Sequence, residues 1–157
     1  MLNIVLVQPE IPNNTGNIGR TAAATGCRLH IVHPIGFDMS EKALRRAGLD
    51  YWHLVDCREH ESWEAFLDRE RPGRAFLFTT KASRAHWDAP FQADDYLLFG
   101  GETRGVSDEI HGWVSDGWGD DHRVTLPMAP EARSLNLATA VCAAVYEARR
   151  QLRTTTI

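Results

Sequence analysis

Short apolar runs alternate along this chain with segments whose apolar residues recur at helical spacing. Residues 2–7 form a run that is apolar apart from Asn3, which is typical of a strand buried on both faces of a parallel sheet. The pattern then predicts a helix that begins at a cap on Asn14 or Thr15 and ends at Gly26, and a strand at residues 28–32. These segments predict a βαβ unit.

The alternation continues to the end of the chain. Further strands are expected at residues 52–55, 75–79, 96–99 and 124–126, and further helices between Ser40 and Gly48, between Ser62 and Pro72, and at residues 137–152. This order predicts an α/β fold with a mostly parallel sheet and flanking helices. A chain of 157 residues, 43% of them hydrophobic, with no linker-like segment is expected to form one domain over residues 1–157.

The N-terminal segment and the cysteines bear on the cellular compartment. The segment lacks the basic region of a signal peptide and is too short to span a membrane, so a cytoplasmic protein without membrane association is expected. Cys27, Cys57 and Cys142 are widely spaced and odd in number, which favours reduced thiols over a disulfide framework or a zinc site. His30 and His33 need not share a face of their strand, so no metal site is expected.

The formal net charge of −4 opposes non-specific binding to nucleic acid, because phosphate affinity comes mainly from clustered lysine and arginine. The basic residues nevertheless gather in three clusters, at Lys42, Arg45 and Arg46, at Lys81 and Arg84, and at Arg149, Arg150 and Arg153. A local basic face is therefore compatible with the acidic total.

Polar or glycine-rich loops follow four of the predicted strands, at residues 13–17, 79–81, 100–105 and 127–134. Ligands of parallel sheets bind outside the carboxyl ends of the strands, so these loops are expected to converge on one pocket. The glycine loop is not a dinucleotide fingerprint, because the G-x-G-x-x-G spacing and the Gly-Lys-Ser/Thr phosphate loop are both absent.

Each motif also has a plain structural interpretation. The segment at residues 9–20 fits a simple helix start with Arg20 in solvent. It also fits an anion site in which Arg20 binds a phosphate. The glycine loop fits a simple strand-to-helix turn. Ser134 or Asn136 fits a cap of the last helix, which leaves the other for a ligand.

The last predicted helix carries two stripes. Its buried stripe is expected to comprise Leu137, Val141, Ala144, Val145, Ala148 and Leu152. Its second stripe combines an aromatic ring with three cations and comprises Tyr146, Arg149, Arg150 and Arg153. The second stripe fits a solvated basic face, and it also fits a surface that stacks on and neutralises single-stranded RNA.

Three motifs resemble, in order and arrangement, those of the SPOUT superfamily of RNA 2′-O-methyltransferases of the SpoU/TrmH type. They are the Asn-Thr-Gly-Asn-Ile-x-Arg segment ending at Arg20, the Phe-Gly-x-Glu-Thr-Arg-Gly loop, and the Pro-Met-x-Pro-x-x-Arg-Ser-Leu-Asn-Leu segment starting at Pro127. Residues 44–51, 66–67 and 79–81 also resemble the short, single-domain tRNA branch called TrmL, so the resemblance covers nearly the whole chain. Gly101 departs from that branch, which usually has proline there.

The resemblance implies a fold, a cofactor and a substrate. The implied fold has a deep trefoil knot in its C-terminal half, binds S-adenosyl-L-methionine (AdoMet) in the knot and works as a homodimer without a metal. The implied substrate is a tRNA whose wobble nucleotide in the anticodon stem-loop, a cytidine or a modified uridine, receives a methyl group on the ribose 2′-oxygen.

The resemblance also assigns roles to residues. The implied catalytic residues are Arg20, Glu102, Ser134 and Asn136, and the implied cofactor-binding residues are Phe78, Thr79, Gly100, Leu126, Met128, Ser134 and Leu135. The expected RNA-binding residues are Asn17, Arg20, Arg133, Tyr146, Arg149 and Arg150. A guanidinium keeps its proton at ordinary pH, so Arg20 is expected to clamp phosphate and polarise the 2′-hydroxyl, while Glu102 is an alternative proton acceptor.

Two other classes of protein stay open from the sequence. A knotted RNA-binding factor without catalysis, acting in tRNA or ribosome maturation, would share the fold, although the polar centre here is complete. An α/β enzyme acting on a small molecule would fit the net acidity.

Overall fold

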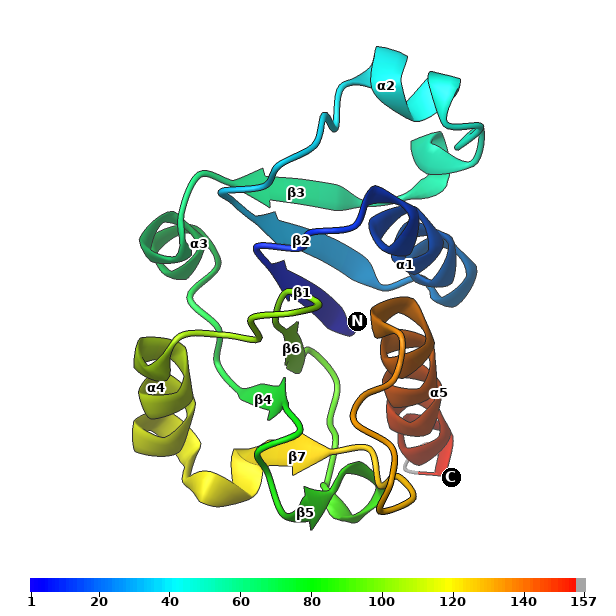
Figure 1. Cartoon of the computed structure of the whole chain (residues 1–157). Coiled ribbons are helices and arrows are strands. Elements are labelled where there is room, and N and C mark those ends of the chain that lie inside the picture. Colours follow the sequence, from blue (N-terminus) through cyan, green and yellow to red (C-terminus); the bar gives the residue numbers. More distant parts are fainter. Residues whose placement is uncertain (155–157) are drawn as a thin grey trace.

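A computed structural model describes residues 1–154 and shows a seven-stranded, parallel sheet with helices on both faces (Figure 1). The strands are β1 (Asn3–Val7), β2 (Arg28–Val32), β3 (Cys57–His60), β4 (Ala75–Phe78), β5 (Arg84–Ala85), β6 (Tyr96–Phe99) and β7 (Arg123–Thr125), in the order β3-β2-β1-β6-β4-β7-β5. The α-helices are α1 (Pro12–Thr25), α2 (Glu41–Arg46), α3 (Trp63–Glu70), α4 (Asp108–Trp118) and α5 (Leu137–Thr154). The predicted α/β class is confirmed. The single domain expected over residues 1–157 includes three residues, 155–157, that lie outside the described part of the chain.

Helices α1 and α5 cover one face of the sheet, and α3 and α4 cover the other (Figure 1). Successive side chains of a strand point to opposite faces, so each central strand feeds both cores. On β1, Ile4 and Leu6 pack on the α1 and α5 side, whereas Val5 and Val7 pack on the α3 and α4 side. This double burial explains why the strand reads as a nearly unbroken apolar run.

The buried stripe predicted for α5 is confirmed. Val141, Ala144, Val145 and Ala148 are fully buried, and Leu137 and Leu152 pack at the edge of the same core. Tyr146 lies on the opposite side of the helix and is 54% exposed. Burial of one face against the sheet and α1 therefore fixes which α5 side chains reach the surface.

The helix cap expected at Asn14 or Thr15 is wrong. Helix α1 begins at Pro12, and the N-cap residue Ile11 makes no side-chain cap hydrogen bond. Proline suits the first turn because it has no N–H to leave unpaired. The missing acceptor comes from a distant loop, since the carboxylate of Glu102 accepts a hydrogen bond from the Ile11 N–H at 3.1 Å.

The strand expected at residues 52–55 is also wrong. Residues Trp52–Leu54 form a 3₁₀ turn, and the strand that pairs with β2 is β3, at Cys57–His60. The apolar side chain of Trp52 packs on Gly19 of α1 rather than in a sheet. An edge strand rich in polar residues gave no apolar signal, and the pattern also missed α4 and the two-residue β5.

The cysteines are free thiols, as the sequence predicted: Cys27 is buried, and Cys57 and Cys142 are partly buried. Burial, with the nearby Glu59 and Asp56 carboxylates, raises the pKa of the Cys57 thiol to about 12, so it stays protonated. Among the described helices, none is long and apolar enough to cross a membrane.

A histidine pair lies inside the α3 and α4 side of the fold. His30 Nδ1 lies 3.0 Å from His60 Nε2, and His30 Nε2 lies 3.2 Å from Asn3 Oδ1. The Glu70 carboxylate lies 3.9 Å from His30 Nδ1 and accepts hydrogen bonds from Arg58 at 3.1 Å. Burial lowers the pKa of His30 to about 4, against the opposing effect of Glu70, so this ring is neutral at neutral pH.

We expect the free energy of unfolding to decrease as the pH falls from about 6.5 to about 4. The unfolded chain protonates His30 near its ordinary pKa of about 6.5, whereas the folded chain resists protonation down to about 4, so acid favours the unfolded state. The difference corresponds to about 3 kcal/mol. Urea unfolding across this pH range measures it. The His30→Gln variant should show a weaker pH dependence, and a flat profile for the parent would contradict the expectation.

Candidate active site

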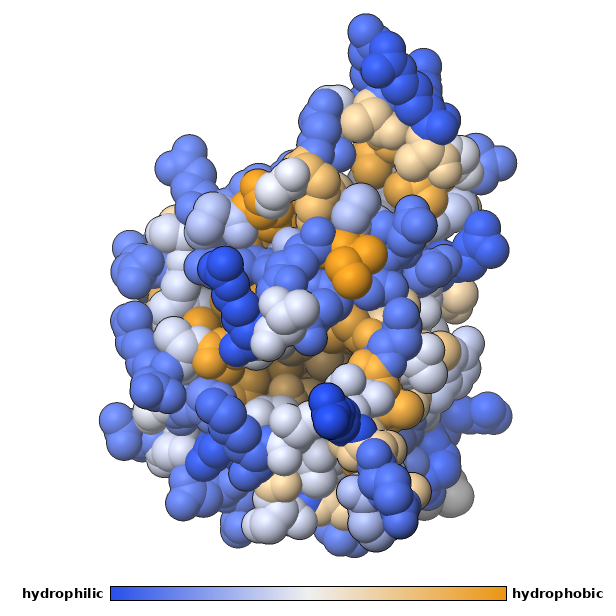
Figure 2. All heavy atoms as spheres, viewed as in Figure 1, coloured by the Kyte–Doolittle hydropathy of each residue, from blue (hydrophilic) through white to orange (hydrophobic). Residues whose placement is uncertain are grey.

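A cavity of about 580 Å³ opens at the carboxyl ends of β4, β6 and β7, between the starts of α1 and α5. Figure 2 shows a hollow on this face of the molecule, with hydrophobic residues in its floor and hydrophilic residues around it. Ten residues singled out from the sequence line the cavity: Phe78, Thr79, Gly100, Glu102, Leu126, Met128, Arg133, Ser134, Leu135 and Asn136. The expected convergence of the loops on one pocket is therefore observed.

Several lining residues were not named individually as site residues from the sequence, among them Asn14, Lys81, Arg104 and His111, although the first three lie in loops expected to converge on the pocket. Asn14, Lys81 and Arg104 lie within the quoted motifs, but His111 is on α4, a helix that was not predicted. Burial lowers the pKa of His111, and the charges of Arg123 and Lys81 add to that effect. The lining thus holds more cations than anions, although the chain is acidic overall.

Glu102 connects the glycine loop to the start of α1. Its carboxylate accepts hydrogen bonds from the N–H of Glu10 at 2.7 Å, the N–H of Ile11 at 3.1 Å and the side-chain amide of Asn14 at 3.3 Å. Backbone N–H groups at a helix N-terminus favour an anion, so the sequence places a carboxylate where the helix lacks its own cap. Glu102 therefore holds the two loops together.

A second carboxylate makes the reverse contact. Glu10, in the loop before α1, accepts hydrogen bonds from the hydroxyl of Thr103 at 2.8 and 3.0 Å. The hydrogen bond from the Thr103 hydroxyl is the main cause of a lowered pKa for Glu10. The β1–α1 and β6–α4 loops are thus joined by two carboxylates that point in opposite directions.

Asn136 caps α5, which resolves one of the alternatives left by the sequence. Its Oδ1 accepts a hydrogen bond from the Thr139 N–H at 3.2 Å, and its amide donates to Asn14 Oδ1 at 3.0 Å. Because Asn14 donates in turn to Glu102, one chain of three side chains links all three motifs. Ser134 is exposed on the cavity wall.

Two glycines shape the β6–α4 loop. A Cβ on Gly100 would lie 2.3 Å from the Gly105 carbonyl carbon, and a Cβ on Gly101 would lie 2.8 Å from the Gln8 carbonyl oxygen. Gly101 and Gly105 also form an isolated antiparallel bridge. The loop therefore doubles back so tightly that Gly100 has no room for any side chain.

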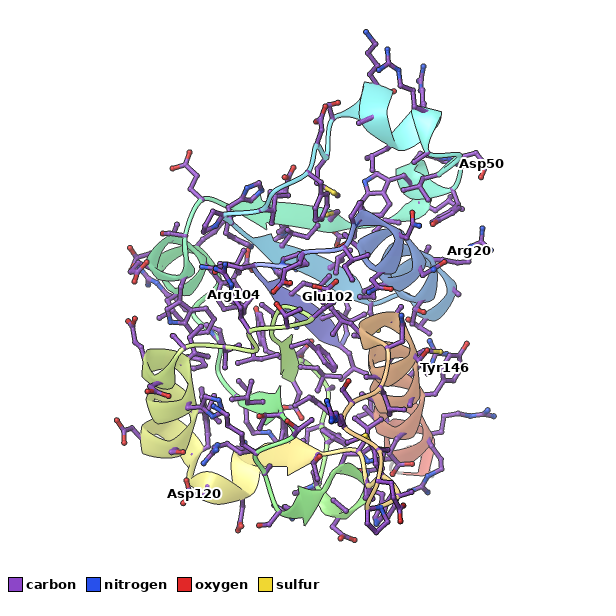
Figure 3. The ribbon with its side chains drawn as sticks, in the orientation of Figure 1. Arg20, Asp50, Glu102, Arg104, Asp120 and Tyr146 are labelled. Atoms are coloured by element: carbon purple, nitrogen blue, oxygen red, sulfur yellow. The ribbon has the colours of Figure 1, made fainter. Side chains whose placement is uncertain are left out.

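Arg20, Asn17 and Tyr146 are exposed and lie outside the cavity lining. Figure 3 shows Arg20 and Tyr146 on the same side of the molecule, projecting from α1 and α5, whereas Glu102 lies near the centre. One chain by itself thus does not bring Arg20 to the cavity.

The two arginines predicted to follow Tyr146 on α5 contact other parts of the chain. The Arg149 guanidinium donates a hydrogen bond to the carbonyl of Thr25 at the end of α1. Arg150 pairs with Glu147 on the same helix at 2.9 Å. Arg149 is therefore part of the α1–α5 contact, and Arg150 forms an ion pair with Glu147.

Within residues 1–154, the one group with three metal-ligand atoms in close range comprises His30, His60 and Glu70, whose atoms lie within 4.8 Å of one another. The His30 and His60 rings are hydrogen-bonded to each other, and Arg58 forms an ion pair with the Glu70 carboxylate. None of the three residues lines the cavity, so this cluster adds nothing to the chemistry there.

Known proteins resemble this chain in sequence and architecture. Residues 1–146 match the SpoU rRNA Methylase family. A tRNA (cytidine(34)-2'-O)-methyltransferase of Yersinia pestis is 49% identical over 157 residues, covering 97% of this chain and 94% of that protein. The chain belongs to the SpoU methylase family, and the resemblance drawn from its three motifs is confirmed.

Two solved structures are informative. One, described as giving structural insights into the 2-OH methylation of C/U34 on tRNA, has a TM-score of 0.87 and 47% identity, covering 98% of this chain and 97% of that one. The other is the SpoU methyltransferase AviRb from Streptomyces viridochromogenes in complex with AdoMet, with a TM-score of 0.79 and 27% identity, covering 99% of this chain and 61% of that one.

Proposed function

We propose that this protein transfers a methyl group from AdoMet to the ribose 2′-oxygen of the wobble nucleotide, a cytidine or a modified uridine, in the anticodon loop of tRNA. The observation that carries the proposal is the convergence of the three SpoU-type motifs on one cavity. The near full-length relative named for this reaction at cytidine 34 supports the choice of substrate.

The cavity suits AdoMet in size and in chemistry. Its volume falls in the range of about 300–1,000 Å³ that is usual for small-molecule sites. Phe78, Leu126 and Met128 offer apolar walls for an adenine ring, and Thr79, Ser134 and the backbone at Gly100 offer polar groups to orient it. A solved SpoU relative that holds AdoMet supports the same assignment.

We assign a role to each residue of the proposed centre. When bound, AdoMet would supply a sulfonium methyl group for transfer to the 2′-oxygen, with the thioether as leaving group and the 2′ proton passing to solvent water. Arg20 clamps the nucleotide phosphate and polarises the 2′-hydroxyl, because its planar fork matches phosphate and keeps its charge. Glu102 and Asn136 brace the walls through the hydrogen bonds described above, and Ser134 faces the ligands. No metal takes part.

The proposed working form is a homodimer with a trefoil knot in its C-terminal half. Arg20 lies outside the cavity of its own chain, which fits delivery to the cavity of a partner. Two exposed apolar residues, Ile11 and Leu135, lie near the starts of α1 and α5, where a partner would cover them. Two observations support the proposal of a knot. The chain belongs to the family, and the segment between β7 and α5 lines the cavity before α5 begins.

Incubation with unmodified tRNA and labelled AdoMet tests the proposal. We expect incorporation at one nucleotide, which mass spectrometry assigns to the wobble position, and loss of incorporation when that ribose is 2′-deoxy. RNA binding without incorporation would favour a non-catalytic factor, and turnover of AdoMet on small molecules alone would favour the third class of protein.

The exposed ring on α5 leads to a separate prediction about tRNA binding. Tyr146→Ala should weaken tRNA binding by about tenfold without changing its salt dependence, because stacking on a base carries no charge. Arg150→Ala should instead lower the magnitude of the logarithmic salt slope by about 0.7–0.9, since one phosphate contact is lost. Filter binding across a salt series measures both effects. Parent-like binding by both variants would show that this stripe is only solvated.

A further inference from the structure

The segment between β2 and β3 lies against α1 through three consecutive contacts. A Cβ on Gly16 would meet the Leu49 side chain at 3.2 Å, and one on Gly19 would meet the Trp52 ring at 2.2 Å. Glycines at these two positions let Leu49 and Trp52 approach the helix backbone closely. Between these two residues is Tyr51, which makes the third contact and reaches Arg20.

Tyr51 touches Arg20 in two ways. The Arg20 Cζ lies 4.7 Å from the centroid of the Tyr51 ring, a distance at which a guanidinium is attracted to the face of an aromatic ring. The Tyr51 hydroxyl donates a hydrogen bond of 2.7 Å to the Gly16 carbonyl. In an α-helix that carbonyl also accepts the N–H of the residue four positions on, which is Arg20. The ring is thus fixed to the turn that carries the arginine.

We propose that Tyr51 is a positioning residue for Arg20 in the methyl transfer, a role that rests on the proposed function. Arg20 is exposed, and a free arginine side chain samples many rotamers. A ring that covers one face of the guanidinium restricts this motion but leaves the N–H groups at its edge free to meet phosphate and ribose oxygens. Tyr51 is half-buried and hydrogen-bonded at its hydroxyl, so it is rigid enough to act in this way.

The contact itself is tested first, without reference to activity. In ¹⁵N NMR spectra, the Nε–H resonance of Arg20, assigned by its loss in Arg20→Lys, should be that of a restrained side chain in the parent and in Tyr51→Phe, which keeps the ring. It should be that of a mobile side chain in Tyr51→Leu. Tyr51→Met serves the same purpose if the leucine variant fails to fold. Equal mobility of Arg20 in parent and ring-deleted variants would overturn the proposal.

Kinetics then separate positioning from simple packing. Tyr51→Leu should lower kcat about five- to tenfold, in the range expected for a lost cation–π contact, with AdoMet affinity unchanged and kcat restored to within about twofold in Tyr51→Phe. Trp87→Leu, which removes another exposed ring far from α1, is the matched control and should stay parent-like. In the Arg20→Ala background, Tyr51→Leu should cost nothing further.

Other outcomes have distinct meanings. A Tyr51→Leu variant that methylates like the parent overturns the proposal, and so does an equal loss of AdoMet affinity, which would mark a purely structural role. Failure of the parent to methylate any tRNA would overturn the proposed function, and it is distinguishable because the NMR contact between Tyr51 and Arg20 would still be present.

Discussion

Alanine in place of Arg20 is expected to lower tRNA methylation by at least about a hundredfold while AdoMet affinity stays within a few-fold of the parent. The guanidinium is the one expected catalytic group outside the cavity lining, so its removal leaves the cofactor pocket intact. Losing a donor aimed at the reacting oxygen typically costs about 10²–10³ in rate. Single-turnover methylation measures the first quantity and calorimetry with AdoMet measures the second.

Arg20→Lys is the matched control. It keeps the charge but loses the planar fork, so its rate should lie between those of the parent and the alanine variant. A parallel loss of AdoMet affinity in Arg20→Ala would refute the assignment of this residue to RNA.

Gly100→Ala should abolish measurable AdoMet binding and destabilise the fold by about 2–4 kcal/mol. The added Cβ would lie 2.3 Å from backbone atoms of Gly105, which no rotamer change can relieve, so the β6–α4 loop must move away from the cavity. Calorimetry with AdoMet and urea unfolding measure the two effects.

Gly112→Ala provides the comparison for this variant. Gly112 lies within α4 and a Cβ there would meet no heavy atom within 4 Å, so alanine should leave AdoMet binding unchanged and stabilise the helix by up to about 1 kcal/mol. Parent-like AdoMet binding by Gly100→Ala would show that the loop tolerates a shift. If the proposed homodimer delivers Arg20 to the partner's cavity, mixed dimers of Arg20→Ala and Gly100→Ala subunits should regain activity, since one cavity then has both an intact wall and a partner's arginine.

The sequence predicted the sheet and the pocket well because both depend on short-range patterns. The nearly unbroken apolar run of β1 identifies a strand buried on both faces, and the apolar stripe of α5 identifies a helix buried on one face. Strand-end loops converge in any parallel sheet, which brought Gly100, Leu126 and Ser134 to one cavity. Only the resemblance to a family, however, supplied the reaction.

Two of the features that the sequence did not predict depend on contacts between distant residues, whereas a third had a local signal. The cap of α1 comes from Glu102, 91 residues beyond Ile11, so no local motif could identify it. The Trp52 turn looked like a strand because its apolar residues cover α1 rather than join the sheet. His111 lines the cavity from α4, a helix whose start at Ser107 was missed although that residue caps it.

The Asn136–Asn14–Glu102 chain has a thermodynamic consequence. It ties the cavity wall, where AdoMet is proposed to bind, to the first turn of α1, the helix that carries Arg20. Whatever free energy this chain transmits between the two sites acts equally in both directions. If AdoMet raises the affinity for tRNA by some factor, tRNA raises the affinity for AdoMet by that same factor, and interruption of the chain at Asn14 would weaken both effects together.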